Sequence, residues 1–201
     1  MNASADLEPA NSSLSDTTAG IMAVVVGPSG AGKDTLMSLA ARHFAGRSDV
    51  HFVRRVITRD GDAGNEDHRS VSELDFDAME QAGAFAVSWE AHGLKYGIPA
   101  DVFDELAQGR LVIANGSRSA LHHFRSAFPH LKVINITASR EVLAERLMAR
   151  GRESRDDVLK RLERSALTVQ GSYDVTDIDN SGTLEEAERA IISVLEVLVR
   201  K

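Results

Sequence analysis

The stretch IMAVVVGPSGAGK, residues 21–33, decides the fold. Its first six residues form a continuous apolar run, which is typical of a strand buried on both faces of a parallel sheet. The glycines that follow let successive backbone N–H groups turn inward around an anion, and a helix that begins at Lys33 adds the partial positive charge of its N-terminus. The pattern therefore predicts a phosphate-binding loop whose lysine reaches the terminal phosphates of a nucleoside triphosphate. The loop residues are Gly27, Pro28, Ser29, Gly30, Ala31, Gly32 and Lys33.

The residue after the lysine departs from the usual form of this motif. Serine or threonine normally stands there to hold Mg²⁺, but this chain has Asp34, followed by Thr35. A carboxylate is a hard oxygen ligand, so Asp34 is the candidate magnesium ligand, with Thr35 as the alternative. Asp34 could instead only favour the helix dipole as an acid in the first turn. The apolar run 111–115 ends in Asn115 rather than in a second magnesium carboxylate, which gives Asp34 the larger part in metal binding.

Beyond this loop, strand-like and helix-like stretches alternate along the chain. This alternation predicts an α/β fold of three layers around a mainly parallel, five-stranded sheet. The expected strands are 21–26, 51–58, 111–115, 131–137 and 173–178, with a further short strand at 84–89. The expected helices are 33–44, 72–81, 99–109, 118–128, 139–150, a basic helix that reaches about 169, and a final helix capped by Thr183 and Glu186.

Composition limits the classes of function. The chain has 201 residues, of which 43% are hydrophobic, so it can form one domain with its own core. A formal net charge of -7 argues against nucleic-acid binding over a broad surface. The absence of cysteine excludes disulfides, thiolate metal sites and a cysteine nucleophile. No apolar run is long enough to span a bilayer, so we expect a cytoplasmic protein with no membrane partner. Residues 1–20 are polar and predict a disordered tail before a domain at 21–201.

Six motifs together resemble one enzyme family. They are GPSGAGKDT at 27–35, VRRVITR at 53–59, GNEDH at 64–68, SWEAHGLKYGIP at 88–99, ANGSR at 114–118 and DNSGTLEEA at 179–187. On these motifs the sequence resembles the ribose 1,5-bisphosphate phosphokinases, which are similar in fold to guanylate kinase. The resemblance runs from Ile21 to the C-terminus.

The resemblance implies a P-loop NTPase fold of the nucleoside-monophosphate-kinase type, with an acceptor-binding insert at about 59–97 and a lid at about 145–165. It also implies a reaction of phosphonate breakdown, in which ATP and Mg²⁺ convert ribose 1,5-bisphosphate to 5-phospho-α-D-ribose 1-diphosphate. ATP and a phosphorylated sugar are then the expected partners, while the oligomeric state stays open.

The acceptor site can be compared with guanylate kinase residue by residue. Guanylate kinases carry a phosphate-contacting run after the second strand, and Thr58 and Arg59 occupy its places here, with Arg55 three residues earlier. The glutamate that reads guanine stands six residues before a glycine equivalent to Gly93, and that position is Val87. Because valine cannot accept the base N–H groups, the acceptor is expected to be a phosphorylated molecule without a base. The alternatives are a guanylate kinase with altered base contacts and a non-catalytic binding module of the same fold.

Further acceptor residues are proposed from the chemistry of a phosphorylated sugar, and three of them have a plainer alternative. Carboxylate and imidazole groups of the GNEDH loop could meet ribose hydroxyls, although a loop histidine is more often solvated. Tyr96 could bind an acceptor phosphate or serve only in packing, and Arg118 could bind phosphate or lie in water. The set is Glu66, His68, Tyr96, Asn115, Ser117 and Arg118.

The segment 139–165 carries more basic than acidic residues although the whole chain is acidic. It resembles the lid of nucleoside-monophosphate kinases, in which arginines close over the γ-phosphate. Arg150 and Arg161 best match the catalytic lid positions, and Arg146 is third. The alternative is that many of these arginines form exposed pairs with acids one turn away. Asn180 follows the last strand, where the resemblance implies the adenine edge of the ATP site.

Overall fold

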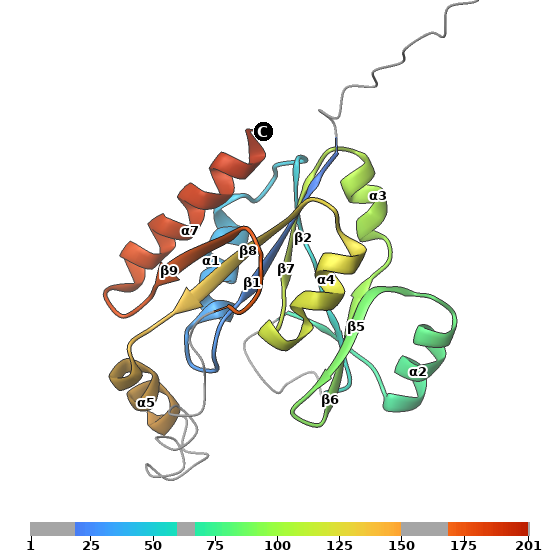
Figure 1. Ribbon diagram of the computed structural model, residues 1–201, viewed down its shortest axis with the longest axis horizontal. Coiled ribbons are helices and arrows are strands. Elements are labelled where there is room, and N and C mark those ends of the chain that lie inside the picture. The colour runs from blue at the N-terminus through green and yellow to red at the C-terminus, as the bar shows by residue number, and fades with distance from the viewer. Residues whose placement is uncertain (1–18, 60–66, 150–168, 201) are drawn as a thin grey trace, which may run out of the picture.

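The computed structural model describes residues 19–59, 67–149 and 169–200, which form two sheets covered by helices (Figure 1). The larger sheet has five strands in the order β2-β7-β1-β8-β9, and every neighbouring pair is parallel. Its strands are β1 (Ile21–Val26), β2 (Val50–Phe52), β7 (Leu111–Asn115), β8 (Leu131–Thr137) and β9 (Val175–Asp179). The predicted mainly parallel, five-stranded sheet is therefore confirmed.

Alternate residues of β1 explain the three layers. Ala23 and Val25 face one core, whereas Met22, Val24 and Val26 face the other. Since side chains alternate along a strand, an all-apolar run places a hydrophobic surface on both faces of the sheet. Figure 1 shows α1 and α7 on one face and α3 and α4 on the other. The bounds are α1 (Lys33–His43), α3 (Val102–Ala107), α4 (Leu121–Ala127) and α7 (Leu184–Val199).

A second, smaller sheet lies between β2 and α3 in the chain. Its order is β4-β3-β6-β5, with β6 antiparallel to both of its neighbours. It consists of β3 (Val56–Ile57), β4 (Arg69–Ser70), β5 (Phe85–Ala91) and β6 (Leu94–Pro99), and α2 (Glu73–Gln81) lies between β4 and β5 in the chain. Buried residues of this sheet pack in the same core as α4 and the main sheet, so the two sheets share one hydrophobic interior.

Three local expectations are wrong in this region. The run 51–58 is not one strand, because β2 ends at Phe52 in the large sheet and β3 begins at Val56 in the small one. Residues 94–99 form β6, a strand that is missing from the predicted set. Pro99 ends that strand opposite Phe85, and the helix begins at Val102 instead.

The turn between β5 and β6 explains the hairpin. His92 has φ 53° and Gly93 has φ 73°, and they join the paired residues Ala91 and Leu94. Two residues with positive φ form the turn whose twist matches an antiparallel hairpin. The structure therefore uses the HG dipeptide as a hairpin turn.

Most helix predictions agree with the structure. Ser72 accepts a hydrogen bond from Asp75 N at 3.1 Å at the start of α2. Thr183 and Glu186 form the predicted capping box of α7. The remaining helices are η1 (Arg118–Ala120) and α5 (Arg140–Ala149). None of the helices in the described ranges is both long and apolar enough to cross a membrane.

Candidate functional site

The phosphate-binding loop lies between the end of β1 and the start of α1, as predicted. Gly32 is the N-cap of α1 and has φ 90°, a conformation that a side chain makes costly. A Cβ at Gly32 would come within 2.4 Å of Asn180 Nδ2, and one at Gly27 within 2.2 Å of the Ile136 carbonyl oxygen. Both glycines are thus required by close packing around the loop.

The Lys33 side chain bends back over this loop. Its Nζ donates to the carbonyl oxygen of Gly27 at 3.0 Å and to that of Pro28 at 3.3 Å. The ammonium group is therefore held at the rim of the turn, next to the backbone N–H groups that follow. This arrangement can neutralise an anion seated in the loop.

Two residues predicted to bind the nucleotide support the loop, one just after β9 and one on α5. Asn180 donates from Nδ2 to the Ala31 carbonyl oxygen at 2.7 Å. Arg146 in turn donates from Nη2 to the Asn180 carbonyl oxygen at 2.9 Å. Arg146 Nη1 and Asn180 Oδ1 are buried, and within the described ranges neither has a hydrogen-bond partner. These two atoms therefore retain hydrogen-bonding capacity beside the loop.

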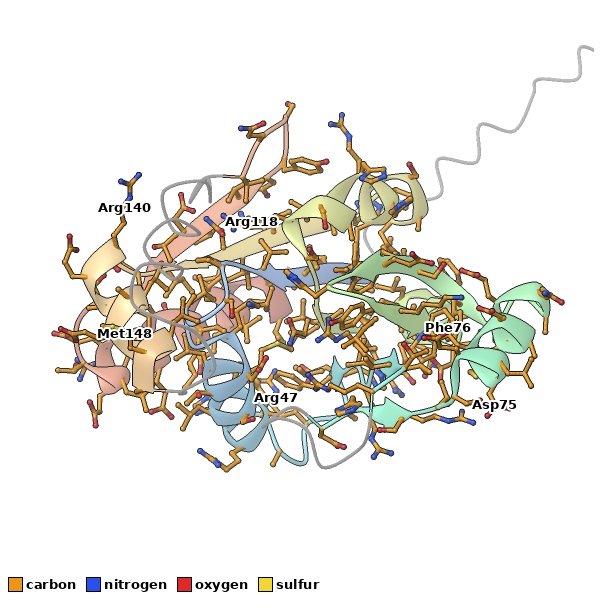
Figure 2. All side chains as sticks on the ribbon, turned by 90° about the horizontal axis from the view of Figure 1, so that it is seen from below. Arg47, Asp75, Phe76, Arg118, Arg140 and Met148 are labelled. Atoms are coloured by element: carbon orange, nitrogen blue, oxygen red, sulfur yellow. The ribbon has the colours of Figure 1, made fainter. Side chains whose placement is uncertain are left out.

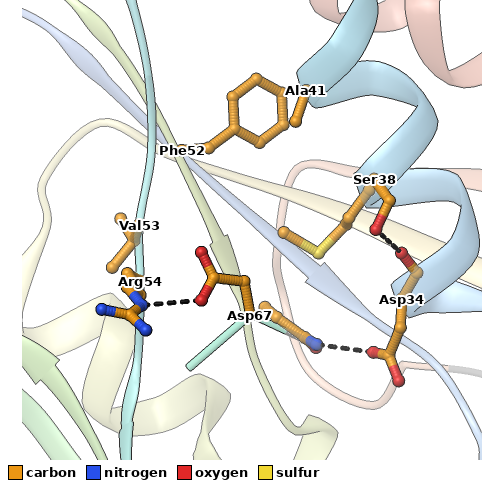
Figure 3. A pocket seen from close by; sticks show the side chains of 9 residues that line it. Asp34, Ser38, Ala41, Phe52, Val53, Arg54 and Asp67 are labelled. Carbon is orange, nitrogen blue, oxygen red and sulfur yellow. Dashed lines mark hydrogen bonds and ion pairs between the residues drawn. The ribbon is translucent and has the colours of Figure 1, made fainter. Parts of the chain in front are cut away.

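Asp34 lies beside the end of β7, where Asn115 donates from Nδ2 to its Oδ1 at 2.9 Å (Figure 3). Asn115 is 4% exposed, so the amide that orients the carboxylate is itself fixed. Thr35, the alternative magnesium ligand, is exposed on α1. The hydrogen bond from Asn115 therefore orients the carboxylate of Asp34. The described part of the chain contains no group of three histidine or carboxylate side chains placed to hold a metal by themselves.

A pocket of about 150 Å³ opens next to Asp34 (Figure 3). At its opposite wall the exposed Arg54 donates from Nε to Asp67 Oδ1 at 2.7 Å. The pocket thus combines charged groups with an apolar floor between α1 and the end of β2. Its lining is Asp34, Met37, Ser38, Ala41, Phe52, Val53, Arg54, Asp67 and Asn115.

The predicted acceptor residues of the small sheet have different surroundings. Arg55 is buried, and its guanidinium lies 5.2 Å from the ring centre of Tyr96. Thr58 accepts from Lys95 N at 2.9 Å through Oγ1, so its hydroxyl oxygen takes part in pairing β6. The Nε of Arg59 is buried and has no hydrogen-bond partner among the described residues. Arg55 and Arg59 thus lie on either side of β3 in the chain.

The pair of Lys95 and Asp77 fixes the same sheet to α2. Lys95 Nζ donates to the Asp77 carboxylate, and this hydrogen bond raises the pKa of Lys95. The ion pair therefore joins β6 to α2.

The remaining candidates lie in separate places. His68 is buried and its Nε2 lies 3.2 Å from Ser70 Oγ, so it is not the solvated loop histidine of the plainer alternative. Ser117 exchanges a 2.8 Å hydrogen bond with Ser119. Arg118 is half-buried, and burial lowers its pKa. In Figure 2 Arg118 lies between Phe76 of α2 at one end of the molecule and Met148 of α5 at the other. Glu66, Arg150 and Arg161 lie outside the described residues, as do residues 1–18 of the tail predicted at 1–20.

Sequence reasoning missed two features of this region. Trp89, 8% exposed, stacks on Tyr96, and Arg54 with Asp67 forms a wall of the pocket. A signal was present in the first case, because Trp89 and Tyr96 lie at equal distances from the HG turn and would pair in a hairpin. Val87, where guanylate kinases carry their base-reading glutamate, is 4% exposed and belongs to the core.

Comparison with known proteins places the chain in a family. A family model described as an AAA domain matches residues 24–187. The chain is 68% identical over 180 residues to "Ribose 1,5-bisphosphate phosphokinase PhnN" of Rhizobium etli. The aligned residues cover 90% of this chain and 91% of the relative. The chain belongs to the ribose 1,5-bisphosphate phosphokinase family. A second family member, from Agrobacterium fabrum, is 63% identical over 87% of this chain and 96% of its own length.

A solved structure supports the same fold. The guanylate kinase of Anaplasma phagocytophilum has a TM-score of 0.65 and 19% sequence identity, over 92% of this chain and 89% of that one. This likeness confirms the guanylate-kinase-like P-loop fold predicted for this chain.

Proposed function

We propose that this protein transfers the γ-phosphoryl group of ATP to ribose 1,5-bisphosphate and forms 5-phospho-α-D-ribose 1-diphosphate in phosphonate catabolism. The observation that carries the proposal is the intact phosphate-binding loop, with Lys33 held over its rim, in a chain 68% identical to a relative of that name. The two other candidates are weaker. Val87 is part of the core and cannot read guanine, and a non-catalytic module would not need the Gly27–Lys33 loop intact.

At the nucleotide end, the loop backbone and Lys33 would bind the β- and γ-phosphates. Arg146 Nη1 and Asn180 Oδ1 would meet polar groups of the nucleotide, since both are buried beside the loop with hydrogen-bonding capacity left. We also propose Thr35 as a nucleotide-binding residue. From the lid we propose Arg150 and Arg161 as the groups that stabilise charge on the transferred phosphate.

The residues present fit a magnesium ion. Mg²⁺ in kinases takes one or two carboxylates together with substrate phosphates and water, and Asp34 offers one carboxylate whose Oδ1 is oriented by Asn115. The ion supplies neutralisation of phosphate charge when bound. Asn115 holds the carboxylate in one orientation, so Asp34 need not reorganise when the nucleotide arrives.

At the acceptor end, an oxygen of the C1 phosphate bonds to the γ-phosphorus while the bond from that phosphorus to the β–γ bridging oxygen breaks, and ADP leaves. The attacking oxygen is already ionised near neutral pH, so catalysis is mainly alignment and charge neutralisation. Arg55 and Arg59, on either side of β3 in the chain, would align the acceptor. The proposed acceptor residues are Arg55, Thr58, Arg59, Glu66, His68, Tyr96, Asn115, Ser117 and Arg118.

The insert at 59–97 binds the acceptor and the region 145–165 closes over the nucleotide. The partners are small molecules, without nucleic acid or membrane. We place the reaction in the cytoplasm, where ATP is available as the phosphoryl donor.

The proposal is tested by measuring ADP release with Mg-ATP and either ribose 1,5-bisphosphate or GMP. We expect turnover with the sugar bisphosphate alone, and Lys33→Ala should lower it by roughly 100- to 1,000-fold because one fixed donor to the transferred phosphate is lost. Lys132→Ala is the matched control, since Lys132 lies on β8 and pairs with Asp174 away from the loop. A folded Lys33→Ala protein with normal turnover would sink the assignment of the loop.

A further inference from the structure

Helix α5 begins beside the segment that follows β9, and one serine hydroxyl joins the two. Ser139 N donates to Ser181 Oγ at 2.7 Å. The same hydroxyl donates to Asp179 Oδ1 at 2.5 Å, and the Ser181 backbone N–H donates to that oxygen at 3.0 Å. Because the hydroxyl proton is directed at the carboxylate, the Ser181 oxygen is oriented to accept from Ser139. We call Asp179, Ser181 and Ser139 the serine bridge.

The serine bridge ends on the residue that starts α5. Ser139 Oγ accepts from Val142 N at 3.3 Å, and the Ser139 carbonyl oxygen accepts from Leu143 N at 2.9 Å, so Ser139 is the N-cap residue. The N–H of an N-cap residue has no partner within its own helix. Ser181 supplies that partner from another element, and this bond fixes the start of α5 to the end of β9.

Arg146 forms a second attachment of α5 to the same segment. It follows Ser139 by seven residues, which is about two helical turns, so the two residues lie on one face of α5. Arg146 Nη2 donates to the Asn180 carbonyl oxygen at 2.9 Å. The neighbouring residues Asn180 and Ser181 can hold both places because long helical side chains lean back toward the N-terminus of their helix.

The second attachment leaves the other nitrogen of the guanidinium next to the phosphate-binding loop. Arg146 Nη1 is buried and has no hydrogen-bond partner in the part of the chain that the structure describes. A Cβ at Gly32, the residue before Lys33, would lie 3.9 Å from this atom. A donor in this place can meet an acceptor atom of a nucleotide bound at the loop, provided that α5 keeps its position.

Apolar packing alone does not fix that position. Leu143 and Leu147 of α5 are buried in the same core as residues of α1 and α7. Burial of apolar surface is favourable but has no direction, so these leucines leave the helix free to turn or slide. Figure 1 shows α5 at one end of the molecule, beyond the arrowhead of β8. The hydrogen bond from Ser139 to Ser181, which depends on distance and angle, restricts both at the start of the helix.

We infer that Ser181, oriented by Asp179, is a positioning residue for the donor nucleotide. The serine bridge fixes the start of α5, and α5 presents Arg146 Nη1 to ATP at the phosphate-binding loop. The inference rests on the proposed function, which gives Arg146 a contact with the nucleotide, and adds to it a determinant of ATP affinity that acts through Arg146. The effect of Ser181 on ATP binding should therefore exist only while Arg146 is present.

The test titrates the full chain with Mg-ATP in the absence of acceptor and then measures KM for ATP and for ribose 1,5-bisphosphate. Ser181→Ala should raise the Kd and the KM for ATP by roughly 3- to 10-fold, the range given by one lost hydrogen bond, and leave the acceptor KM within about twofold. Ser181→Thr keeps the hydroxyl, so its Kd for ATP should stay within about twofold of that of the unmodified protein.

A double-mutant cycle determines whether Ser181 acts through Arg146. Ser181→Ala made in an Arg146→Ala protein should leave the Kd for ATP as it is in Arg146→Ala alone, because the donor that the serine bridge positions is gone. Thr183→Ala is the matched control. It removes a hydroxyl that accepts from Glu186 N at the start of α7, two residues beyond Ser181, and should leave the Kd for ATP unchanged.

Asp179→Asn is a second, milder variant. Its amide oxygen can still accept from Ser181 but lacks the charge that strengthens the bond, so the Kd for ATP should rise by a smaller factor. An unchanged Kd in both Ser181→Ala and Asp179→Asn would overturn the inference, as would an equal rise in Thr183→Ala or in the Arg146→Ala protein. Failure of the unmodified protein to make any diphosphate, with ATP still bound, would instead refute the proposed function alone.

Discussion

Asn115 at the end of β7 donates from Nδ2 to Asp34 Oδ1 at 2.9 Å, and so joins the carboxyl edge of the sheet to the first turn after the phosphate-binding loop. The usual motif has a hydroxyl at the position of Asp34 and a strand-ending carboxylate near Asn115. In this chain the carboxylate is on the helix and the neutral amide is on the strand. The hydrogen bond from Asn115 to Asp34 thus joins a neutral group on the strand to the acidic group on the helix.

Asp34→Asn should raise the magnesium concentration needed for half-maximal activity by roughly tenfold, because the hard oxygen charge is lost while the bond to Asn115 can remain. Asn115→Ala should give a smaller shift in the same direction, since it only frees the carboxylate. The measurement is initial rate against free Mg²⁺ at saturating ATP.

Ser38→Ala is the control for these two variants. Ser38 lies one turn further along α1 and donates to the Asp34 carbonyl oxygen at 2.8 Å, so it touches the same residue without touching its carboxylate. Unchanged magnesium dependence in Asp34→Asn would restrict Asp34 to stabilising the helix dipole.

Gly32→Ala should lower both the stability and the ATP affinity of the protein. The residue has φ 90°, and the new Cβ would come within 2.4 Å of Asn180 Nδ2, which itself bonds the loop at Ala31. Gly46→Ala is matched to it, because Gly46 has φ 82° with nothing within 4 Å of its Cβ position. Gly46→Ala should cost about 1 kcal/mol from backbone strain alone.

Urea unfolding and ATP titration of the two glycine variants separate strain from collision. Gly32→Ala should lose more stability than Gly46→Ala, and only Gly32→Ala should weaken ATP binding. Equal losses of stability in the two variants would show that the Asn180 side chain can move away from the new Cβ at no cost in free energy.

Glu186→Gln should lower stability at neutral pH and lose its effect in acid. The Thr183 backbone N–H, which donates to Glu186 Oε2 at 3.1 Å, holds the pKa of Glu186 below its ordinary value of 4.5. A lowered folded-state pKa adds stability above the unfolded pKa, and that stability is lost as pH falls through the folded value. Urea unfolding at about pH 7 and about pH 3 measures the difference.

Glu185→Gln serves as the control, since it removes the same charge from the same helical turn without the bond to Thr183. Its effect should change less between the two pH values. A Glu186→Gln effect that is equally large in acid would contradict a role for the carboxylate charge in the capping box.

The main sheet and the phosphate-binding loop could be predicted because their signals are local. An apolar run such as 21–26 is needed wherever a strand is buried on both faces, and the loop glycines are needed where the backbone turns around an anion. The capping box at Thr183 is local in the same way. In each case a few neighbouring residues are sufficient to specify the conformation.

The small sheet depends on contacts that are distant in sequence. The run 51–58 is strand-like throughout, and nothing within it marks the change of sheet after Phe52, which follows from pairing with β7 on one side and β6 on the other. Gly97 lies inside β6, where a Cβ would come within 2.5 Å of the Phe85 ring, so the glycine is needed for a contact 12 residues away in the sequence. For the same reason the stacking of Trp89 on Tyr96 could not be recognised until β5 and β6 were aligned.

The most direct measurement is phosphorus NMR of the protein with Mg-ATP, ribose 1,5-bisphosphate and GMP in one sample. The signal of the C1 phosphate should be replaced by the two coupled signals of a C1 diphosphate, in step with the formation of ADP and with GMP unchanged. Formation of GDP, with the sugar bisphosphate signals unchanged, would contradict the proposed acceptor.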